Sequence, residues 1–342
     1  MDNLMDEAKF QEIVENVIQQ YKTAGIKSTS IPVDMPESTR LSARKNNVTQ
    51  NDPAADDTNS PAFTVPRIIQ PIHSTKAQTT ASLQVDLPDP TLDEYRYRPL
   101  VNHPKDPAAL RELIASTSAR IGVGRTGPRY KTASQLLFQG DHAITQDALY
   151  REIDQRLLDE FKLFTIQTKV VEGKEQYLLR PDLGRQINDE GKRVISQKCS
   201  KAPNIQIVVG DGLSTTAIEA NLRQIMPVLL QGFQNANLSV GTPFYVKYCR
   251  VGVMNDIGET INPDIVILLI GERPGLGRAE SMSAYMGYKP KHGNNDADRD
   301  VICNIFENGG TNPLEAGAFI VQFAKKMVQH QASGVKLKLV TK

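Results

Sequence analysis

The sequence has few cysteines and histidines, and neither residue type occurs at a spacing that indicates a metal centre. Its three cysteines, Cys199, Cys249 and Cys303, stand far apart and form no Cys-x-x-Cys pair. This argues against a disulfide framework and against a zinc cluster, and it is typical of a reducing cytosol. The five histidines form neither His-x-x-x-His nor His-Glu-x-x-His. We therefore expect no metal site in this chain.

The sequence also lacks an excess of charge of one sign and long apolar runs. Its 40 basic and 39 acidic residues leave a formal net charge of +1, which gives no reason to expect binding to nucleic acid or to an anionic membrane surface. It contains no apolar run of the roughly 18 residues that a membrane helix needs. The N-terminus shows no basic segment followed by an apolar one, as a secretory signal would. A cytoplasmic protein with no membrane or nucleic-acid partner is expected.

Residues 1–21 predict an amphipathic helix. Their apolar residues recur at the three- and four-residue spacing of one helical face: Phe10, Ile13, Val14, Val17, Ile18 and Tyr21. Because isolated helices shorter than about 12–15 residues are marginal in water, we expect this helix to dock on a surface. That surface is either a partner protein or the chain's own folded part.

Residues 22–88 differ in composition from the rest of the chain. They are rich in Ser, Thr, Asn, Asp, Pro and Gln, and Phe63 is their only aromatic residue. Such a segment cannot bury enough apolar surface to offset the entropy that it loses on ordering. We expect it to be a disordered linker.

The remaining chain predicts an α/β fold in two parts. Residues 89–200 form a mainly helical region, with helices expected over residues 106–120, 141–161 and 181–200 and a small hairpin over residues 164–171 and 175–181. Residues 201–342 form the second part, with strands expected over residues 205–209, 243–248 and 265–270 and helices over residues 216–236, 254–261 and 312–333. Strands that alternate with helices predict βαβ crossovers. We expect a Rossmann-like parallel sheet with flanking helices, preceded by the smaller helical region and the disordered N-terminal extension.

The stretch DIVILLIGERPGLG, residues 264–277, predicts a ligand-facing edge of this sheet. Residues 265–270 are all apolar, which is typical of a strand buried on both faces of a parallel sheet. Ligands of open parallel sheets bind just beyond the carboxyl ends of the strands. Glu272 and Arg273 follow the strand between two glycines, so we expect this acid and base at the rim of a ligand site.

Two glycine-containing loops are candidates for nucleotide binding. Residues 122–127, GVGRTG, match Gly-x-Gly-x-x-Gly, but a helical pattern precedes them, whereas a dinucleotide loop follows a strand and begins a helix. We expect no dinucleotide site there. Residues 210–217, GDGLSTTA, follow a strand and begin a helix, but they lack the third glycine. This second loop is either a plain turn or a ligand rim, with Ser214 or Thr215 as the helix cap.

The other polar motifs do not complete a catalytic site. Asp141 and His142 are expected at a helix start, either as a cap with a solvated imidazole or as a general base. Cys303 is expected to be buried and inert. No complete set of nucleophile, acid and base residues is present. The residues alone therefore indicate a ligand-binding α/β domain with a tethered helix.

Several long blocks, in fixed order, closely resemble the light (small) subunit of ethanolamine ammonia-lyase. They are ARIGVGRTGPRYKTASQLLFQGDHAITQDAL (119–149), YLLRPDLGR (177–185), VVGDGLSTTAI (208–218), GTPFYVKYCRVGV (241–253), LLIGERPGLGRAESMSAY (268–285) and NGGTNPLEAG (308–317). The resemblance covers roughly residues 95–334, and the order of several long blocks makes it specific.

The resemblance implies an enzyme that uses adenosylcobalamin to convert ethanolamine into acetaldehyde and ammonia by radical chemistry. In this family the large subunit is a TIM barrel that binds the substrate, and the light subunit is Rossmann-like and helps to enclose the cobalamin. Carried over onto the matched blocks, three cobalamin contacts fall on Val251, Glu272 and Val301. The family usually has a cysteine at the third position, whereas here the cysteine is Cys303. A backbone or van der Waals contact is therefore expected at Val301, and no residue of this chain is expected to be catalytic.

The resemblance also implies partners. We expect a hetero-oligomer with the large subunit. Enzymes of this family often work inside a bacterial microcompartment, so residues 1–21 are expected to bind its shell or cargo. Two other interpretations stay open: a Rossmann-type nicotinamide oxidoreductase, which neither glycine loop favours, and a non-catalytic scaffold that recruits partners through its helix.

Overall fold

The computed structural model describes residues 92–117, 119–276, 278–307 and 309–341. All of them belong to the larger of two compact units into which the chain divides. The helix predicted over residues 1–21 and the linker predicted over residues 22–88 lie outside the described residues. The boundary between residues 200 and 201 stays a prediction.

Helices and strands alternate in the central part of the described chain, from α7 to β6. The helices are α2 (Asp93–Arg96), α3 (Pro107–Ala115), α4 (Thr132–Tyr150), α5 (Gln155–Glu160), α6 (Lys174–Leu179), α7 (Asp189–Lys198), α8 (Thr215–Asn235), α9 (Val253–Ile261), α10 (Pro313–His330) and α11 (Gly334–Val340). The strands are β1 (Arg125–Thr126), β2 (Arg129–Tyr130), β3 (Phe164–Gln167), β4 (Ile205–Gly210), β5 (Phe244–Lys247), β6 (Ile265–Gly271), β7 (Met282–Tyr288) and β8 (Arg299–Ile305). Two short 3-10 helices are η1 (Leu183–Arg185) and η2 (Asp296–Asp298).

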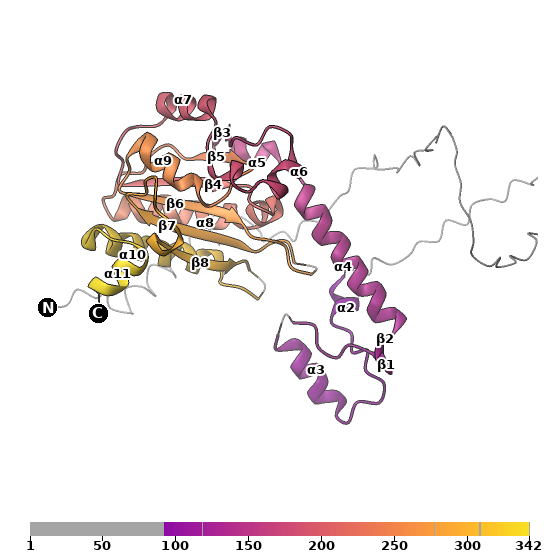
Figure 1. The fold of residues 1–342 in the computed structure, drawn as a ribbon. Coiled ribbons are helices and arrows are strands. Elements are labelled where there is room, and N and C mark those ends of the chain that lie inside the picture. The colour runs from indigo at the N-terminus through magenta and orange to yellow at the C-terminus, as the bar shows by residue number, and fades with distance from the viewer. Residues whose placement is uncertain (1–91, 118, 277, 308, 342) are drawn as a thin grey trace, which may run out of the picture. The chain divides into compact units, whose positions relative to one another are not determined.

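A six-stranded mixed sheet has the strand order β3-β5-β4-β6-β7-β8 (Figure 1). The ladders from β3 to β6 are parallel, but those of β6 with β7 and of β7 with β8 are antiparallel. The α/β class is confirmed, whereas the prediction of a parallel sheet is wrong for β7 and β8. The physical reason is the connection after β6: residues 272–281 contain no crossover helix, and a short connection joins antiparallel strands.

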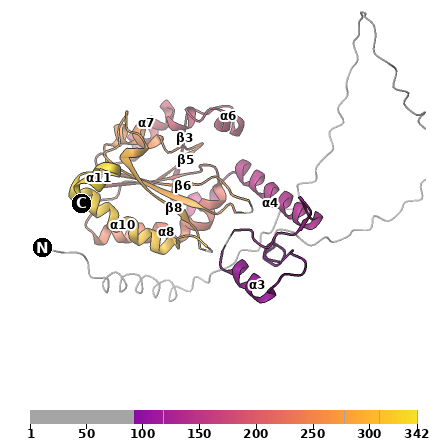
Figure 2. The same cartoon turned by 60° about the horizontal axis from the view of Figure 1, so that its bottom comes forward.

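Strand β6 lies between two apolar cores. Residues Ile265, Ile267 and Leu269 pack in one core with α8 and α10, and Val266, Leu268 and Ile270 pack in the other with α7 and α9. Figure 1 shows α7 and α9 on one face of the sheet and α8 and α10 on the other, and Figure 2 shows α7 opposite α8 and α10 from a second direction. The prediction of a strand buried on both faces is confirmed, and each buried side chain of this size stabilises the fold by about 1.5–3 kcal/mol.

Most of the predicted helices are confirmed, with shifted ends. Helix α8 includes Pro227 in its interior, and helix α3 begins with Pro107 after Asp106, whose carboxylate accepts from two backbone N–H groups. The helix predicted over residues 141–161 is instead the second half of α4 followed by the separate helix α5. The helix predicted over residues 181–200 is shorter, because η1 precedes α7.

The hairpin predicted over residues 164–171 and 175–181 does not form. Strand β3 pairs in parallel with β5, and the second half of the predicted hairpin is helix α6. Residues 174–179, KEQYLL, are mostly good helix formers, and the side chain of Tyr177 is fully buried. The partner of β3 lies far along the chain, so a local pattern could not identify it.

Candidate functional site

The three residues expected to contact a cofactor lie on the same face of the sheet. Val251 lies in the turn between β5 and α9, Glu272 directly follows β6, and Val301 lies in β8. Strand side chains alternate between faces, so Glu272 shares the face of Ile270, which packs with α7 and α9. Tyr285 of β7 packs against the same core as Val251 and pairs with Val301. This face is the candidate site.

Glu272 is hydrogen-bonded to β7, to the residue that precedes β7, and to β8. One carboxylate oxygen accepts from the Ser281 hydroxyl at 2.5 Å, and the other accepts from the Ser283 hydroxyl and from the Asn304 N–H, the latter at 3.1 Å. An ionised carboxylate offers about four lone-pair positions. The three bonds therefore fix the direction of this carboxylate and leave it able to accept a further hydrogen bond.

Val301 and Cys303 are on the surface of the edge strand. The Val301 residue is 48% exposed, and Cys303 is exposed as well. The expectation of a buried Cys303 is wrong, because β8 ends the sheet and no core covers these side chains. Arg273, which precedes Pro274, is also exposed. The surface beside Glu272 is thus accessible to a large ligand.

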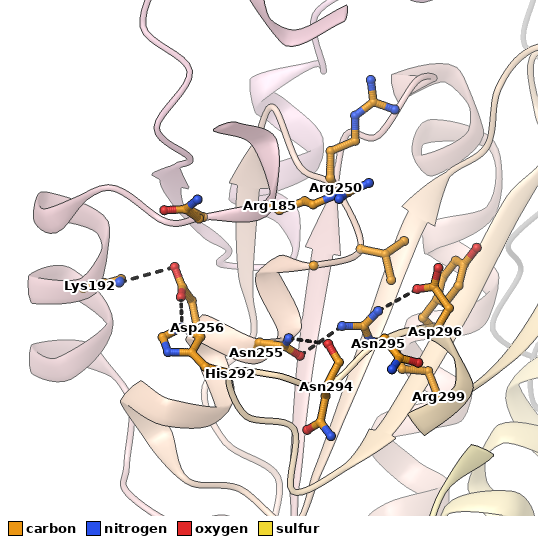
Figure 3. A pocket seen from close by; sticks show the side chains of 14 residues that line it. Arg185, Lys192, Arg250, Asn255, Asp256, His292, Asn294, Asn295, Asp296 and Arg299 are labelled. Carbon is orange, nitrogen blue, oxygen red and sulfur yellow. Dashed lines mark hydrogen bonds and ion pairs between the residues drawn. The ribbon is translucent and has the colours of Figure 1, made fainter. Parts of the chain in front are cut away.

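A cavity of about 650 Å³ lies beside Val251 and Tyr285 (Figure 3). Sites for small molecules commonly have volumes of about 300–1,000 Å³. Cationic and amide side chains make up much of its lining, among them Arg185, Arg250 and Arg299. The segments that supply them are η1, the turn after β5, and the start of β8.

Asp256 of α9 joins three elements at one side of this cavity. One of its oxygens accepts the Ile187 N–H at 2.7 Å and lies 3.3 Å from the Lys192 ammonium, and the other lies 2.5 Å from Nε2 of His292. Burial is the largest influence on the carboxyl and opposes its ionisation. The hydrogen bonds from His292 and Ile187 and the charge of Lys192 outweigh burial, so the pKa of Asp256 lies below its usual value.

We expect Asp256→Asn to lower the free energy of unfolding by about 1–3 kcal/mol at neutral pH, because buried hydrogen bonds to a charged group are lost. The folded-state pKa is depressed, so the stabilisation is present above the unfolded-state pKa and disappears as the pH falls through the folded-state value. Urea unfolding of both proteins at neutral pH and at steps below about pH 4 measures the difference. A difference that grows on acidification would contradict this origin.

A second buried carboxylate fixes the turn that carries Val251. Asp211 follows β4 and accepts the N–H groups of Tyr248 and Cys249, each at 2.7 Å. Burial raises the pKa of Asp211, whereas the charge of Lys174 and the backbone N–H groups act in the opposite direction. Tyr248 has a φ of 58°, which is uncommon for a residue other than glycine. The two hydrogen bonds therefore stabilise an unfavourable backbone conformation next to the site.

The two glycine loops differ in structure as their contexts predict. Residues 122–127 lead into the short β1–β2 hairpin, so they do not connect a strand to a helix as a dinucleotide loop does. Residues 210–217 connect β4 to α8. Ser214 caps α8 by accepting the Ala217 N–H at 3.3 Å, which confirms the predicted cap.

Asp141 and His142 are not at a helix start. Both lie inside α4, where Asp141 is buried and pairs with Arg96 and Arg120, while His142 is exposed. The prediction of a cap is therefore wrong, because α4 begins at Thr132. Adjacent residues of a helix do not face each other, so this pair does not form an acid–base unit.

Sequence patterns did not identify the residues that shape the cavity. Tyr285, Asp256, His292 and Arg185 come from segments that are far apart in the sequence. The only sequence signal for these residues is that several of them stand at or near the ends of the blocks that resemble the family. Which of them meet depends on the way α7 and α9 pack on the sheet.

The described ranges lack two kinds of feature. In that part of the chain no group of three or more His, Cys, Asp or Glu side chains could hold a metal ion. None of its helices is both long enough and apolar enough to cross a membrane.

Comparisons with known proteins agree with each other. The sequence profile of the family described as "Ethanolamine ammonia-lyase light chain" matches residues 107–338. Proteins named "Ethanolamine ammonia-lyase small subunit" are 44% identical over 263 residues in Clostridium perfringens and 44% identical over 259 residues in Listeria monocytogenes serovar 1/2a. These matches cover 77% and 76% of this chain and 88% of each relative. A protein of the same name from Lachnoclostridium phytofermentans is 42% identical over 263 residues, which is 77% of this chain and 88% of that protein. The profile match runs from α3 into α11 and includes every element around the cavity.

Proposed function

Because the chain belongs to the family of ethanolamine ammonia-lyase light chains, we propose that it works in an adenosylcobalamin-dependent lyase that converts ethanolamine into acetaldehyde and ammonia. As a small subunit it has a large subunit as partner. In the proposed division of roles, the large subunit binds the substrate and this chain helps to enclose the cofactor. The observation that supports this role is the common face of Val251, Glu272 and Val301 beside the cavity.

The chemistry of that face fits a cobalamin. A corrin ring is broad, apolar on its surfaces and fringed with amide groups. Half-exposed Val301 and the partly buried Tyr285 offer apolar contact, and the remaining acceptor capacity of Glu272 suits an amide N–H. The cavity beside Val251 provides space for a part of the ligand that extends beyond the ring.

The bound cofactor would supply the radical chemistry, and the protein would supply binding, orientation and exclusion of water. In this chain, Glu272 would orient one amide of the ring edge. Asp211 would keep the Val251 turn in position through its two backbone hydrogen bonds. We assign no catalytic residue to this chain.

Co-expression with a large subunit of this family tests the proposal. Ammonia release from ethanolamine should require both subunits and added adenosylcobalamin, and the purified complex should show a corrinoid absorption spectrum. Nicotinamide fluorescence in place of that spectrum would favour an oxidoreductase. Ammonia release by this chain alone, loaded with cobalamin, would contradict the proposed division of roles.

We also propose that residues 1–21 dock on the shell or cargo of a bacterial microcompartment. These residues lie outside the described ranges, so the proposal depends on their apolar stripe in the sequence. Val14→Glu places a charge within that stripe and should abolish co-localisation with the compartment, without changing the activity of the purified complex. Fluorescence microscopy of tagged proteins measures this. Normal entry of the variant into compartments would remove the targeting role.

A further inference from the structure

Two arginines of the cavity meet through a reciprocal contact between glycine-containing segments. Arg185 lies against Gly252, where an added Cβ would stand 2.8 Å from the Cβ and Cγ atoms of Arg185. Arg250 lies against Gly184, where an added Cβ would stand 2.7 Å from the Cγ atom of Arg250. The Arg250 N–H also donates to the Gly184 carbonyl at 2.8 Å. Only glycine permits this approach, so each arginine stem packs on the glycine of the other segment. Both arginines are labelled in Figure 3.

The two arginines bring positive charge that the cavity does not neutralise. Its two acidic residues, Asp256 and Asp296, already have cationic partners. None of the ion pairs between described residues includes Arg185 or Arg250. This end of the cavity is therefore suited to an anion.

Arg250 is also held in one orientation. Its guanidinium lies over the ring of Tyr177, 4.2 Å from the centroid, and donates to the Tyr177 carbonyl at 3.3 Å. Tyr177 is itself fully buried and donates its hydroxyl to the Cys249 carbonyl at 2.8 Å. The Nε atom of Arg250 is buried without a hydrogen-bond partner. The contacts with Tyr177 fix the direction of the guanidinium, so an anion in the cavity would meet a group that is already oriented.

We propose that Arg185 and Arg250 form a phosphate-binding subsite, and that its occupant is the phosphodiester in the nucleotide tail of the cofactor. Guanidinium groups match the oxygens of phosphate in geometry and charge. Val251, the expected corrin contact, stands between Arg250 and Gly252 in the sequence. One ligand that carries both a corrin ring and a phosphodiester accounts for this adjacency. The inference rests on the proposed function. Free inorganic phosphate carries the same anionic oxygens and is the alternative ligand of this subsite.

Equilibrium dialysis of the complex with the large subunit tests the subsite. The two probes are cobalamin and cobinamide, which has the same ring but lacks the nucleotide tail and its phosphodiester. Arg185→Gln should weaken cobalamin binding about 10- to 100-fold and leave cobinamide binding unchanged, because one charge-assisted hydrogen bond is lost. Arg185 is exposed, so this change should not impair folding.

Two further variants test whether the weaker binding comes from loss of the phosphate contact. Arg250→Lys keeps a charge near the Tyr177 ring but loses the planar fork of donors, so it should also weaken cobalamin binding selectively. Arg180→Gln is the matched control, because Arg180 is exposed, pairs with Asp182 and does not line the cavity. It should bind both probes as the wild type does. Added salt should weaken cobalamin binding more in the wild type than in Arg185→Gln.

The outcomes separate this inference from the proposed function. If the wild-type complex binds neither corrinoid, the proposed function itself fails. If it binds both but Arg185→Gln weakens both equally, or neither, the subsite is overturned. Inorganic phosphate, titrated by calorimetry, tests the other source. Phosphate binding that needs Arg185, together with unchanged cobalamin affinity in Arg185→Gln, would assign the subsite to free phosphate and overturn the inference.

Discussion

Replacement of Glu272 by alanine is expected to weaken adenosylcobalamin binding about 10- to 100-fold in the complex with the large subunit. A hydrogen bond to a charged group contributes roughly 1.5–3 kcal/mol, and about 1.4 kcal/mol corresponds to a tenfold change in affinity. The KM for ethanolamine at saturating cofactor should change little, because the substrate is assigned to the large subunit. Equilibrium dialysis of the cofactor and a titration of cofactor against activity measure the two constants.

Weaker binding must be separated from a change in folding, since Glu272 also joins three strands. Ser283→Ala removes one internal donor to the carboxylate and keeps its charge. It should lower the thermal stability slightly and leave the affinity for the cofactor nearly unchanged. Thermal unfolding of Glu272→Ala gives its stability directly. If a Glu272→Ala complex of normal stability binds the cofactor as the wild type does, Glu272 does not belong to the site.

Gly271→Ala is expected to lower the free energy of unfolding by at least about 3 kcal/mol, at the upper end of the range for overpacked sites. An added Cβ would overlap the carbonyl oxygen of Ser214 and stand 2.7 Å from the carbonyl oxygen of Asp211. Both are backbone atoms of the β4–α8 connection, so neither can rotate away as a side chain would. With an unfolding entropy of about 2.1 cal/mol/K per residue, a loss of about 3 kcal/mol should lower the midpoint of thermal unfolding of a chain of this size by roughly 4–6 °C. Circular dichroism during heating measures this shift.

Gly275→Ala is the matched control for this prediction. Gly275 lies in the same connection between β6 and β7, but an added Cβ there would meet no atom within 4 Å. The substitution also reduces the conformational entropy of the unfolded chain. Its stability should therefore equal or slightly exceed that of the wild type. Equal destabilisation by both alanines would show that the loop, rather than the steric overlap, causes the effect.

The sequence alone determined the elements whose evidence is local. Residues 265–270 are apolar at every position and form a strand buried on both faces. Helix α8, a cap at Ser214 or Thr215, and the position of Glu272 just beyond β6 were also predictable. Periodicity, capping and strand ends involve neighbours only a few residues apart, so spacing within one segment identifies them. The family could be recognised for a related reason, because its blocks are contiguous.

Only the tertiary structure decided which distant segments meet. Strand β3 pairs with β5 rather than in a local hairpin, and β7 and β8 complete the sheet in antiparallel order. The hydrogen bonds to Glu272 depend on the antiparallel pairing of β7 and β8. The contact of Arg185 with the turn after β5 joins two further segments that are distant in the sequence. Cross-strand pairing and helix packing depend on complementary surfaces that are brought together by the whole chain. Their energy is absent from the spacing of any one segment, which is why the cavity could not be derived from sequence patterns.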